Sequence, residues 1–313
     1  MIGTVTALDF GSVVLGGNVF GWTTDRDEGF RVLDAFVDGG GRAIDTADVY
    51  VAWIPGNSGG ESETIIGEWL ASRKRRDDVV IATKVGSLAG RPGLSAANIE
   101  AAAEDSLRRL GTDRIDLYFA HRDDEGTAQE ETLAAFDRLV QSGKVREIGA
   151  SNFSADRLRS AASIAAAEGL TPFTVAQDQW SLVERAVEID LVPTLEELGI
   201  AEIPYSSLGS GFLTGKYRPG AAAESARAGK AGAYLENPRN LDLLEALDDV
   251  AADHGVPVAA IALAWLATQR TVAAPIASAR TVEQVPDLLA AGRVRLTPQD
   301  VEQLSATTEP VSG

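Results

Sequence analysis

The sequence predicts an α/β protein folded as a (β/α)8 TIM barrel, with an N-terminal β-hairpin and extra helices near the C-terminus. Three observations support this prediction. Short apolar segments alternate with helical patterns along the chain. Several of these segments end on an isolated polar residue, and the intervals between those residues each fit one helix plus one strand. In a TIM barrel the C-terminal ends of all strands lie on one face, so these polar residues are expected to share a site.

The elements are expected in a regular order. A hairpin around Phe10 and Gly11 is predicted over residues 4–14, and a first strand over Val13–Gly17. Apolar periodicity and capping residues then predict helices over Asp27–Val37, Glu61–Arg75 and Ala96–Arg109, the last with Ser95 as its N-cap. A capping box at Thr127–Glu130 predicts the start of another helix. Two more are predicted, one capped by Ser154 and one over residues 187–198. A long segment rich in Gly and Ala follows at 206–240, and a last strand is predicted at Thr271–Pro275.

Length and composition bound the class of protein. The chain has 313 residues, 45% of them hydrophobic, which suits one sizeable core, so we expect a single domain over residues 1–313. There is no Cys and there are two His, so thiolate catalysis and Cys-based zinc sites are excluded and no metal is expected. A net charge of −18 argues against nucleic acid or an anionic membrane as a partner, yet permits a small anionic ligand held by local cations.

Targeting features are not evident. The N-terminus lacks a basic start followed by an apolar core, so no secretion signal is expected. The longest apolar run, 258–267, is about half of what a bilayer span needs. A cytoplasmic location is therefore predicted, and the oligomeric state stays open.

Four residues at or just after predicted strand ends suggest a chemistry. Asp45 ends one apolar strand, Tyr50 follows on the next loop, and Lys84 and His121 each close a later strand. Alone, each has an ordinary interpretation, as a helix cap, a loop anchor, a surface charge or a half-buried polar group. If all four lie at one barrel mouth, the Lys84 ammonium favours the phenolate form of Tyr50, and the Asp45 carboxylate keeps Lys84 charged and fixed. A neutral His121 then donates a hydrogen bond to an acceptor oxygen. Such a set protonates a carbonyl oxygen while another group adds hydride to the carbon.

With these residues in view, the chain resembles the aldo-keto reductase family over nearly its whole length. The resemblance rests on six motifs, Asp45–Tyr50, Gly60–Glu63, Ala82–Lys84, Tyr118–His121, Gly149–Phe153 and Tyr205–Tyr217. It implies an NADPH-dependent oxidoreductase that reduces an aldehyde or ketone to an alcohol. In this family pattern Tyr50 is the general acid, Lys84 and Asp45 tune it, and His121 positions the carbonyl.

The resemblance also implies which residues bind the cofactor NADP(H). Ser151, Asn152 and Gln177 would hold the nicotinamide carboxamide, and Trp180 would stack on the ring where the family often has a Tyr. The diphosphate would lie on the segment that contains Tyr205, Ser206, Leu208, Gly209, Gly211 and Lys216. The 2′-phosphate would lie at Ser278, Arg280 and Gln284, which open the final barrel helix. The family's acidic residue–Asn pair at the adenine is Asp287-Leu288 here, so its Asn is missing.

The small-molecule carbonyl substrate is less defined by the sequence. Trp22, Trp53 and Arg122 lie on loops predicted at the active face. Arg122 either meets an acidic or hydroxyl-rich substrate or pairs with Asp123 or Asp124 at the surface.

Other interpretations stay open at this point. A doubly wound open sheet is disfavoured because the nearest match to a G-x-G-x-x-G fingerprint, at Gly209-Ser210-Gly211, has its third Gly one residue late. A cofactor-binding regulatory or structural subunit on the same fold would keep the nicotinamide site without turnover. An unrelated barrel hydrolase with paired carboxylates would not bind nicotinamide at all.

Overall fold

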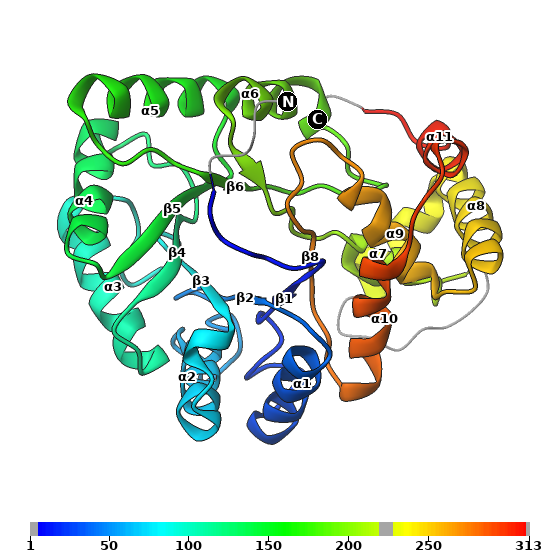
Figure 1. Cartoon of the computed structure of the whole chain (residues 1–313), viewed down its shortest axis with the longest axis horizontal. Helices are drawn as coiled ribbons and strands as arrows, with labels where there is room; N and C mark the ends of the chain where they lie inside the picture. Colours follow the sequence, from blue (N-terminus) through cyan, green and yellow to red (C-terminus); the bar gives the residue numbers. More distant parts are fainter. Residues whose placement is uncertain (1–5, 219–227, 311–313) are drawn as a thin grey trace.

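The structure, a computed structural model, describes residues 6–218 and 228–310 and has eight parallel strands arranged as a ring with helices outside it (Figure 1). The strands are β1 (Val14–Gly16), β2 (Ala43–Asp45), β3 (Val80–Val85), β4 (Ile115–Ala120), β5 (Val145–Ser151), β6 (Val175–Gln177), β7 (Ala201–Glu202) and β8 (Ile276–Ala277). Each pairs with its sequence neighbour from β1 to β7, and β8 pairs with β1. This confirms the predicted (β/α)8 class.

The ring closes between β7 and the segment that leads into β8. Glu202 donates from its backbone N–H to Thr271 O at 2.8 Å and accepts from the N–H of Ala273 at 2.8 Å. The N–H of Ile276 then donates to Pro204 O at 2.9 Å. The last strand was expected at Thr271–Pro275, and the structure corrects this, because β8 begins at Ile276 and only Val272 of the expected range bridges to β7.

The predicted hairpin is not present in the described residues. Residues 6–13 contain no strand, and residues 4 and 5 lie outside the described part. In Figure 1 this dark-blue segment runs across the middle of the ring. Leu8 and Phe10 are buried there against residues from inside the barrel, such as Leu117 and Phe119. The segment therefore fills the barrel opening with apolar side chains instead of pairing as a hairpin.

The outer helices follow the strands. They are α1 (Arg26–Asp38), α2 (Glu61–Arg73), α3 (Ala96–Leu110), α4 (Gln129–Gln141), α5 (Ala155–Glu168), α6 (Val187–Leu198), α7 (Ala228–Ala233), α8 (Pro238–His254), α9 (Val258–Ala267), α10 (Val285–Ala290) and α11 (Pro298–Ala306). The predicted helices are confirmed within two residues, and Ser95 and Ser154 cap α3 and α5 through their hydroxyls. The extra helices near the C-terminus are α7, α8 and α11.

The predicted capping box before α4 is wrong. Ala128 is the N-cap residue, and no side chain caps the helix. The hydroxyl of Thr127 instead donates to Asp124 Oδ2 at 2.7 Å. Thr127 therefore organises the loop before α4 and not the helix terminus.

The segment predicted as a long loop at 206–240 contains short helices. A 3-10 helix covers Gly209–Thr214, α7 and a second 3-10 helix at Tyr234–Glu236 follow, and α8 begins at Pro238. Residues 219–227 of the segment lie outside the described part.

Within the described residues, no single helix is long and apolar enough to cross a membrane. The pair α8 and α9 meets the length and composition test together, but it is bent by 95° between the two helices.

Alternation along the strands decides which side chains point into the barrel. The interior cluster includes Ala43, Ala82, Leu117, Val175 and Ile203, whereas their strand neighbours contact the helices. Because successive strand side chains alternate between faces, residues two positions further on point the same way. The residues so placed, above the apolar interior, are Asp45, Lys84, His121, Gln177 and Tyr205.

One close helix–helix contact gives a testable prediction. A Cβ at Gly67 of α2 would lie 2.2 Å from Arg109 O at the end of α3. Gly67→Ala should therefore push the helices apart and lower the free energy of unfolding by about 1–3 kcal/mol, the cost of overpacking. The control is Gly232→Ala in α7, where an added Cβ meets nothing within 4 Å. Equal melting temperatures for the two variants would contradict the prediction.

Candidate active site

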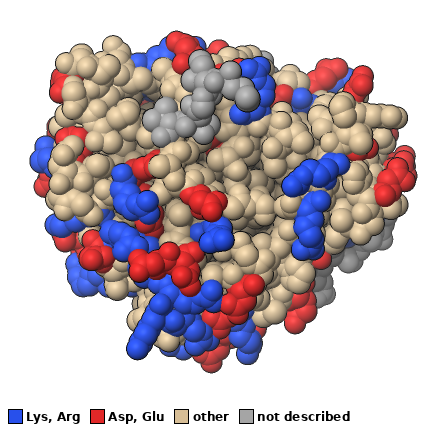
Figure 2. All heavy atoms as spheres, viewed as in Figure 1, with Lys and Arg blue, Asp and Glu red and all other residues tan. Residues whose placement is uncertain are grey.

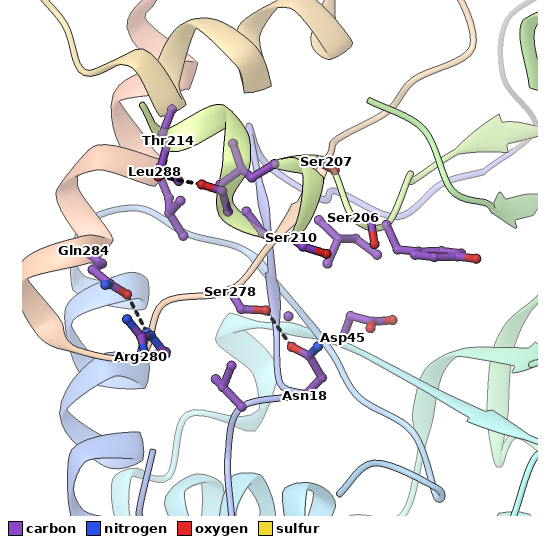
Figure 3. A pocket seen from close by; sticks show the side chains of 18 of the residues that line it. Asn18, Asp45, Ser206, Ser207, Ser210, Thr214, Ser278, Arg280, Gln284 and Leu288 are labelled. Atoms are coloured by element: carbon purple, nitrogen blue, oxygen red, sulfur yellow. Dashed lines mark hydrogen bonds between the residues drawn. The ribbon is translucent and has the colours of Figure 1, made fainter. Parts of the chain in front are cut away.

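A cavity of about 600 Å³ lies at the C-terminal ends of the strands. Figure 3 shows Arg280 and Gln284 at one end of it and Asp45 towards the other. Its lining includes most of the predicted site residues, namely Trp22, Asp45, Tyr50, His121, Arg122, Ser151, Asn152, Gln177, Tyr205, Ser206, Leu208, Gly211, Lys216, Ser278, Arg280 and Gln284. The structure therefore brings together residues from many parts of the chain in one pocket.

At the floor of the pocket, Asp45 forms a buried ion pair with Lys84, which lies behind the lining. The Nζ of Lys84 lies 2.7 Å from each carboxylate oxygen of Asp45 and donates to Thr46 O at 2.7 Å. Gln177 adds a hydrogen bond from Nε2 to Asp45 Oδ1 at 2.9 Å. Burial lowers the pKa of Lys84, and the Asp45 carboxylate opposes that shift. The ammonium is thus held by three oxygens in a place without solvent.

Tyr50 connects this pair to the pocket. Its hydroxyl accepts from Lys84 Nζ at 2.9 Å and lies 3.1 Å from Asp45 Oδ2. The Lys84 ammonium is also 4.6 Å from the centre of the Tyr50 ring. Since Lys84 is fully buried and Tyr50 lines the cavity, the phenol is the part of the cluster that a ligand reaches.

His121 lies beside Tyr50, with ring centres 6.0 Å apart in an edge contact. Burial first, and then the charges of Lys84 and Arg122, lower the pKa of His121 to about 3. The imidazole is therefore neutral at ordinary pH and carries one N–H. Its Nδ1 is buried without a hydrogen-bond partner among the described residues, which favours the proton on Nε2.

A second acidic layer lies next to this cluster. Asp48 is buried, and neither of its carboxylate oxygens makes a well-formed hydrogen bond in the described structure. Burial, and then the Glu63 carboxylate, raise the pKa of Asp48 to about 7. Glu63 itself is held by the Thr83 hydroxyl and by Arg109, each at 2.6 Å. Asp48 therefore holds a proton more readily than an ordinary Asp carboxyl.

Asn152 is held in a strained conformation by a buried acid pair. Its φ is +58°, in the left-handed region that Asn tolerates better than most residues. Its backbone N–H donates to Asp178 Oδ1 at 2.9 Å, and the N–H of Asp178 donates to Glu202 Oε1 at 2.8 Å. Its side-chain oxygen accepts from the Tyr205 hydroxyl at 2.8 Å. Burial raises the pKa of both Asp178 and Glu202, so the pair retains a proton more readily than exposed carboxyls.

The segment after β7 forms a wall with features that suit phosphate. Ser206, Ser210 and Gly211 all have positive φ, which turns the backbone sharply around the pocket. A Cβ at Gly211 would lie 3.4 Å from Lys216 Nζ, so the ammonium lies directly over the glycine. Gly209 is buried and packs behind this wall without lining the cavity.

The far end of the pocket holds Arg280. Its backbone N–H donates to Gln284 Oε1 at 2.8 Å (Figure 3), and its guanidinium makes no ion pair among the described residues. The hydroxyl of Ser278 donates to Asn18 Oδ1 at 2.7 Å, which joins β8 to the loop after β1. Asp287 and Leu288 line the same end, where the sequence lacks the family's usual Asn.

Two predicted aromatic residues lie elsewhere than expected. Trp180 does not line the cavity: its ring is buried and its indole N–H donates to Glu188 Oε1 at 2.9 Å. The aromatic ring next to it that does line the cavity is that of Tyr205, whose backbone oxygen accepts from the backbone N–H of Trp180 at 3.3 Å. Trp53 is 52% exposed and meets the pocket residue Trp22 edge-on at 6.0 Å, and so contributes to the rim only.

Comparison with known proteins agrees with this geometry. The Aldo/keto reductase family model matches residues 12–309. The chain belongs to this family. Relatives include the uncharacterized oxidoreductase YrpG of Bacillus subtilis, 35% identical over 309 residues, with 96% of this chain and 93% of the relative covered. The probable aryl-alcohol dehydrogenase AAD4 of Saccharomyces cerevisiae is 32% identical, covering 90% and 88%. Norsolorinic acid reductase A of Aspergillus parasiticus is 32% identical, covering 90% and 71%.

Membership has a general consequence for chemistry. The aldo-keto reductases are oxidoreductases that generally use nicotinamide cofactors and act on small carbonyl compounds or alcohols. Among the described residues of this aldo-keto reductase, no group of three or more His, Asp or Glu is placed to hold a metal ion.

Sequence reasoning missed several pocket and supporting residues of this aldo-keto reductase. Asn18, Thr23, Ser207, Ser210 and Thr214 line the cavity, and Asp178 and Glu202 support Asn152. The alternation of inward and outward side chains along each strand places Gly16 and Gln177 near the site. No local sequence signal identifies Asp178 as the partner of Asn152. That contact depends on the packing of β5 against β6.

The raised pKa of Asp48 gives a prediction for stability. Its folded pKa of about 7 lies above the ordinary value, so between about pH 4 and 7 the folded state holds a proton that the unfolded state has lost. Stability from this group therefore falls as the pH rises to 7 and is level above it. Asp48→Asn cannot lose this proton, so its free energy of unfolding should not fall in this way as the pH rises from about 4 to 7. The difference in free energy of unfolding between the variant and the parent should therefore shift in favour of the variant by up to about 1.4 kcal/mol per pH unit. Chemical unfolding from pH 4.5 to 8 measures this, with the exposed Asp242→Asn as control. A constant difference across that range would refute it.

Proposed function

We propose that the protein is an NADPH-dependent reductase of aldehydes or ketones in which Tyr50 is the general acid. The observation that supports this best is the Tyr50 hydroxyl, 2.9 Å from the Lys84 ammonium and next to a neutral His121 in the pocket. A phenol that can give up its proton needs its anion stabilised nearby, and a buried ammonium provides that.

The residues of this chain have distinct parts in the proposed reaction. A bound reduced nicotinamide supplies the hydride to the carbonyl carbon. His121 donates a hydrogen bond from Nε2 to the carbonyl oxygen and orients it. Tyr50 then gives its proton to that oxygen, while Lys84 stabilises the phenolate left behind. Asp45 keeps Lys84 charged and in place through its two 2.7 Å contacts.

The pocket fits a dinucleotide with phosphate groups. Asn152, Gln177 and Ser151 line the pocket and would bind the carboxamide, and the Tyr205 ring offers a stacking face. Ser206, Leu208, Gly211 and Lys216 surround the diphosphate region with turned backbone and one ammonium. Arg280 at the far end is suited to a 2′-phosphate, which is why we propose NADPH over NADH.

The substrate class follows from the rim and the relatives. Trp22 and Trp53 form an aromatic edge contact beside the cavity mouth. Three relatives are named as aryl-alcohol dehydrogenases, so aromatic aldehydes are the first substrates to assay. The complete set of Asp45, Tyr50, Lys84 and His121 argues for turnover and against a binding-only regulatory subunit. A panel that yields cofactor binding without turnover would favour that subunit instead.

Loss of the proposed proton donor should be selective. Tyr50→Phe should lower kcat by about a hundredfold or more while the Kd for NADPH stays nearly unchanged, because only the proton in the transition state is lost. Steady-state kinetics and fluorescence titration give the two values. Tyr234→Phe is the control, since Tyr234 bonds Glu184 and lies outside the cavity lining. Near-parental turnover in Tyr50→Phe would rule out Tyr50 as the acid.

Cofactor choice is tested at Arg280. Arg280→Ala should weaken NADPH binding by roughly 1.5–3 kcal/mol, the size of a hydrogen bond to a charged group, and leave NADH almost unaffected. Arg293→Ala removes an exposed guanidinium outside the cavity lining and serves as the control. Equal losses for both cofactors would show that Arg280 does not contact the 2′-phosphate.

A further inference from the structure

Basic side chains of this acidic protein are mostly neutralised by carboxylates. Arginines on the surface pair with Asp or Glu in many places, such as Arg73 with Asp34 and Arg218 with Asp248. The lower left of Figure 2 shows the same pattern, with blue side chains next to red ones. With 46 acidic and 28 basic residues in the chain, carboxylates are in excess. A guanidinium that pairs with no carboxylate of the protein is therefore a candidate for binding an anionic ligand.

Arg122 is such a guanidinium, and it lines the pocket. Within residues 6–218 and 228–310 it makes no ion pair or hydrogen bond through its side chain. The acids that follow it in sequence are already engaged. Asp123 binds Arg157 at 2.7 and 2.9 Å, and Asp124 accepts from the N–H of Leu94 at 2.8 Å and from the Thr127 hydroxyl at 2.7 Å. The surface pairing considered for Arg122 from the sequence is therefore not formed.

The position of Arg122 places its charge at the reacting end of the pocket. It follows His121 directly, at the end of β4, and shares the cavity lining with Tyr50 and His121. Its charge contributes to the lowered pKa of His121, after burial and Lys84. At Tyr205, burial and the Asp178 carboxylate raise the pKa, and Arg122 opposes them. The guanidinium is thus close enough to act electrostatically on rings at the carbonyl end.

The cations that line the pocket lie in two separate regions, one suited to the cofactor phosphates and one beside the proposed carbonyl site. Lys216 and Arg280 lie along the part suited to the cofactor phosphates. Arg122 lies with Tyr50 and His121, where the carbonyl would be bound. A guanidinium presents a planar fork of donors that matches a carboxylate with two parallel hydrogen bonds. Because Arg122 is an exposed residue of the pocket lining, water weakens such a contact but does not abolish its directionality.

The geometry points to Arg122 as the anchor for a carboxylate carried by the substrate, so that the preferred substrates are aldehydes or ketones bearing an acid group. This inference rests on the proposed carbonyl reductase function. It adds that the substrate is an oxo acid, held by its carbonyl at Tyr50 and His121 and by its carboxylate at Arg122.

The test compares acids with neutral analogues of nearly equal shape. The substrates are 2-, 3- and 4-formylbenzoate, each paired with the matching formylbenzamide, and the proteins are the parent, Arg122→Gln, Arg122→Lys and the control Arg293→Gln. The readout is the ratio of kcat/KM for acid to that for amide. Intrinsic reactivity of each aldehyde cancels when this ratio is compared between parent and variant. The three isomers sample different distances between carbonyl and carboxylate.

For at least one isomer, the ratio should fall about tenfold or more in Arg122→Gln, the size of a charge-assisted hydrogen bond. Arg122→Lys should recover part of it, and Arg293→Gln should match the parent. Added salt should lower the ratio in the parent but not in Arg122→Gln. An unchanged ratio for all three isomers, or a loss explained by a weaker Kd for NADPH, would overturn the role of Arg122. A parent enzyme that reduces neither acids nor amides would instead overturn the proposed reductase function.

Discussion

The structure of the site depends on one buried ion pair, between Lys84 and Asp45. Each ion would be costly to bury alone, because desolvation takes several kcal/mol per charge. Two 2.7 Å contacts between them, with further hydrogen bonds to Thr46 O and from Gln177, offset that cost. The pair in turn holds the Tyr50 hydroxyl at the pocket surface. Replacing either partner would leave an uncompensated charge, so the two residues depend on each other.

Around that pair the site is built from barrel geometry and turned backbone. Lys84, Asp45 and Gln177 come from different strands and point inward because they continue the inward-facing alternation. Burial beside Lys84 keeps His121 neutral, so the imidazole donates a hydrogen bond without adding positive charge. The pocket wall after β7 is shaped by the backbone instead, since the positive φ of Ser210 and Gly211 bends this segment around the cavity. Rigid strands thus position the chemistry, and loops form the binding surface.

The cations without an ion pair show where a strongly acidic protein offers positive charge to a ligand. Most of its arginines are neutralised locally by Asp or Glu, which confines strong positive potential to few places. Arg280 and Arg122 are among the exceptions, and both line the same pocket. The net charge of −18 therefore describes the surface as a whole and says little about the pocket. Local pairing, not composition, decides which cations are available to a ligand.

The sequence by itself determined the barrel class and most helix boundaries, because strand ends and helix caps leave local patterns that need no tertiary contact. It also predicted that Asp45, Tyr50, Lys84 and His121 lie together, since each is at or just after a strand end. Only the tertiary structure decided that the segment before β1 plugs the barrel, that Trp180 packs on Glu188 while Tyr205 faces the cavity, and that Asp178 holds Asn152. The physical reason is that burial and hydrogen-bond partners depend on which distant segments meet. Side-chain direction and the availability of a charge are therefore properties of the packed chain and not of the local sequence.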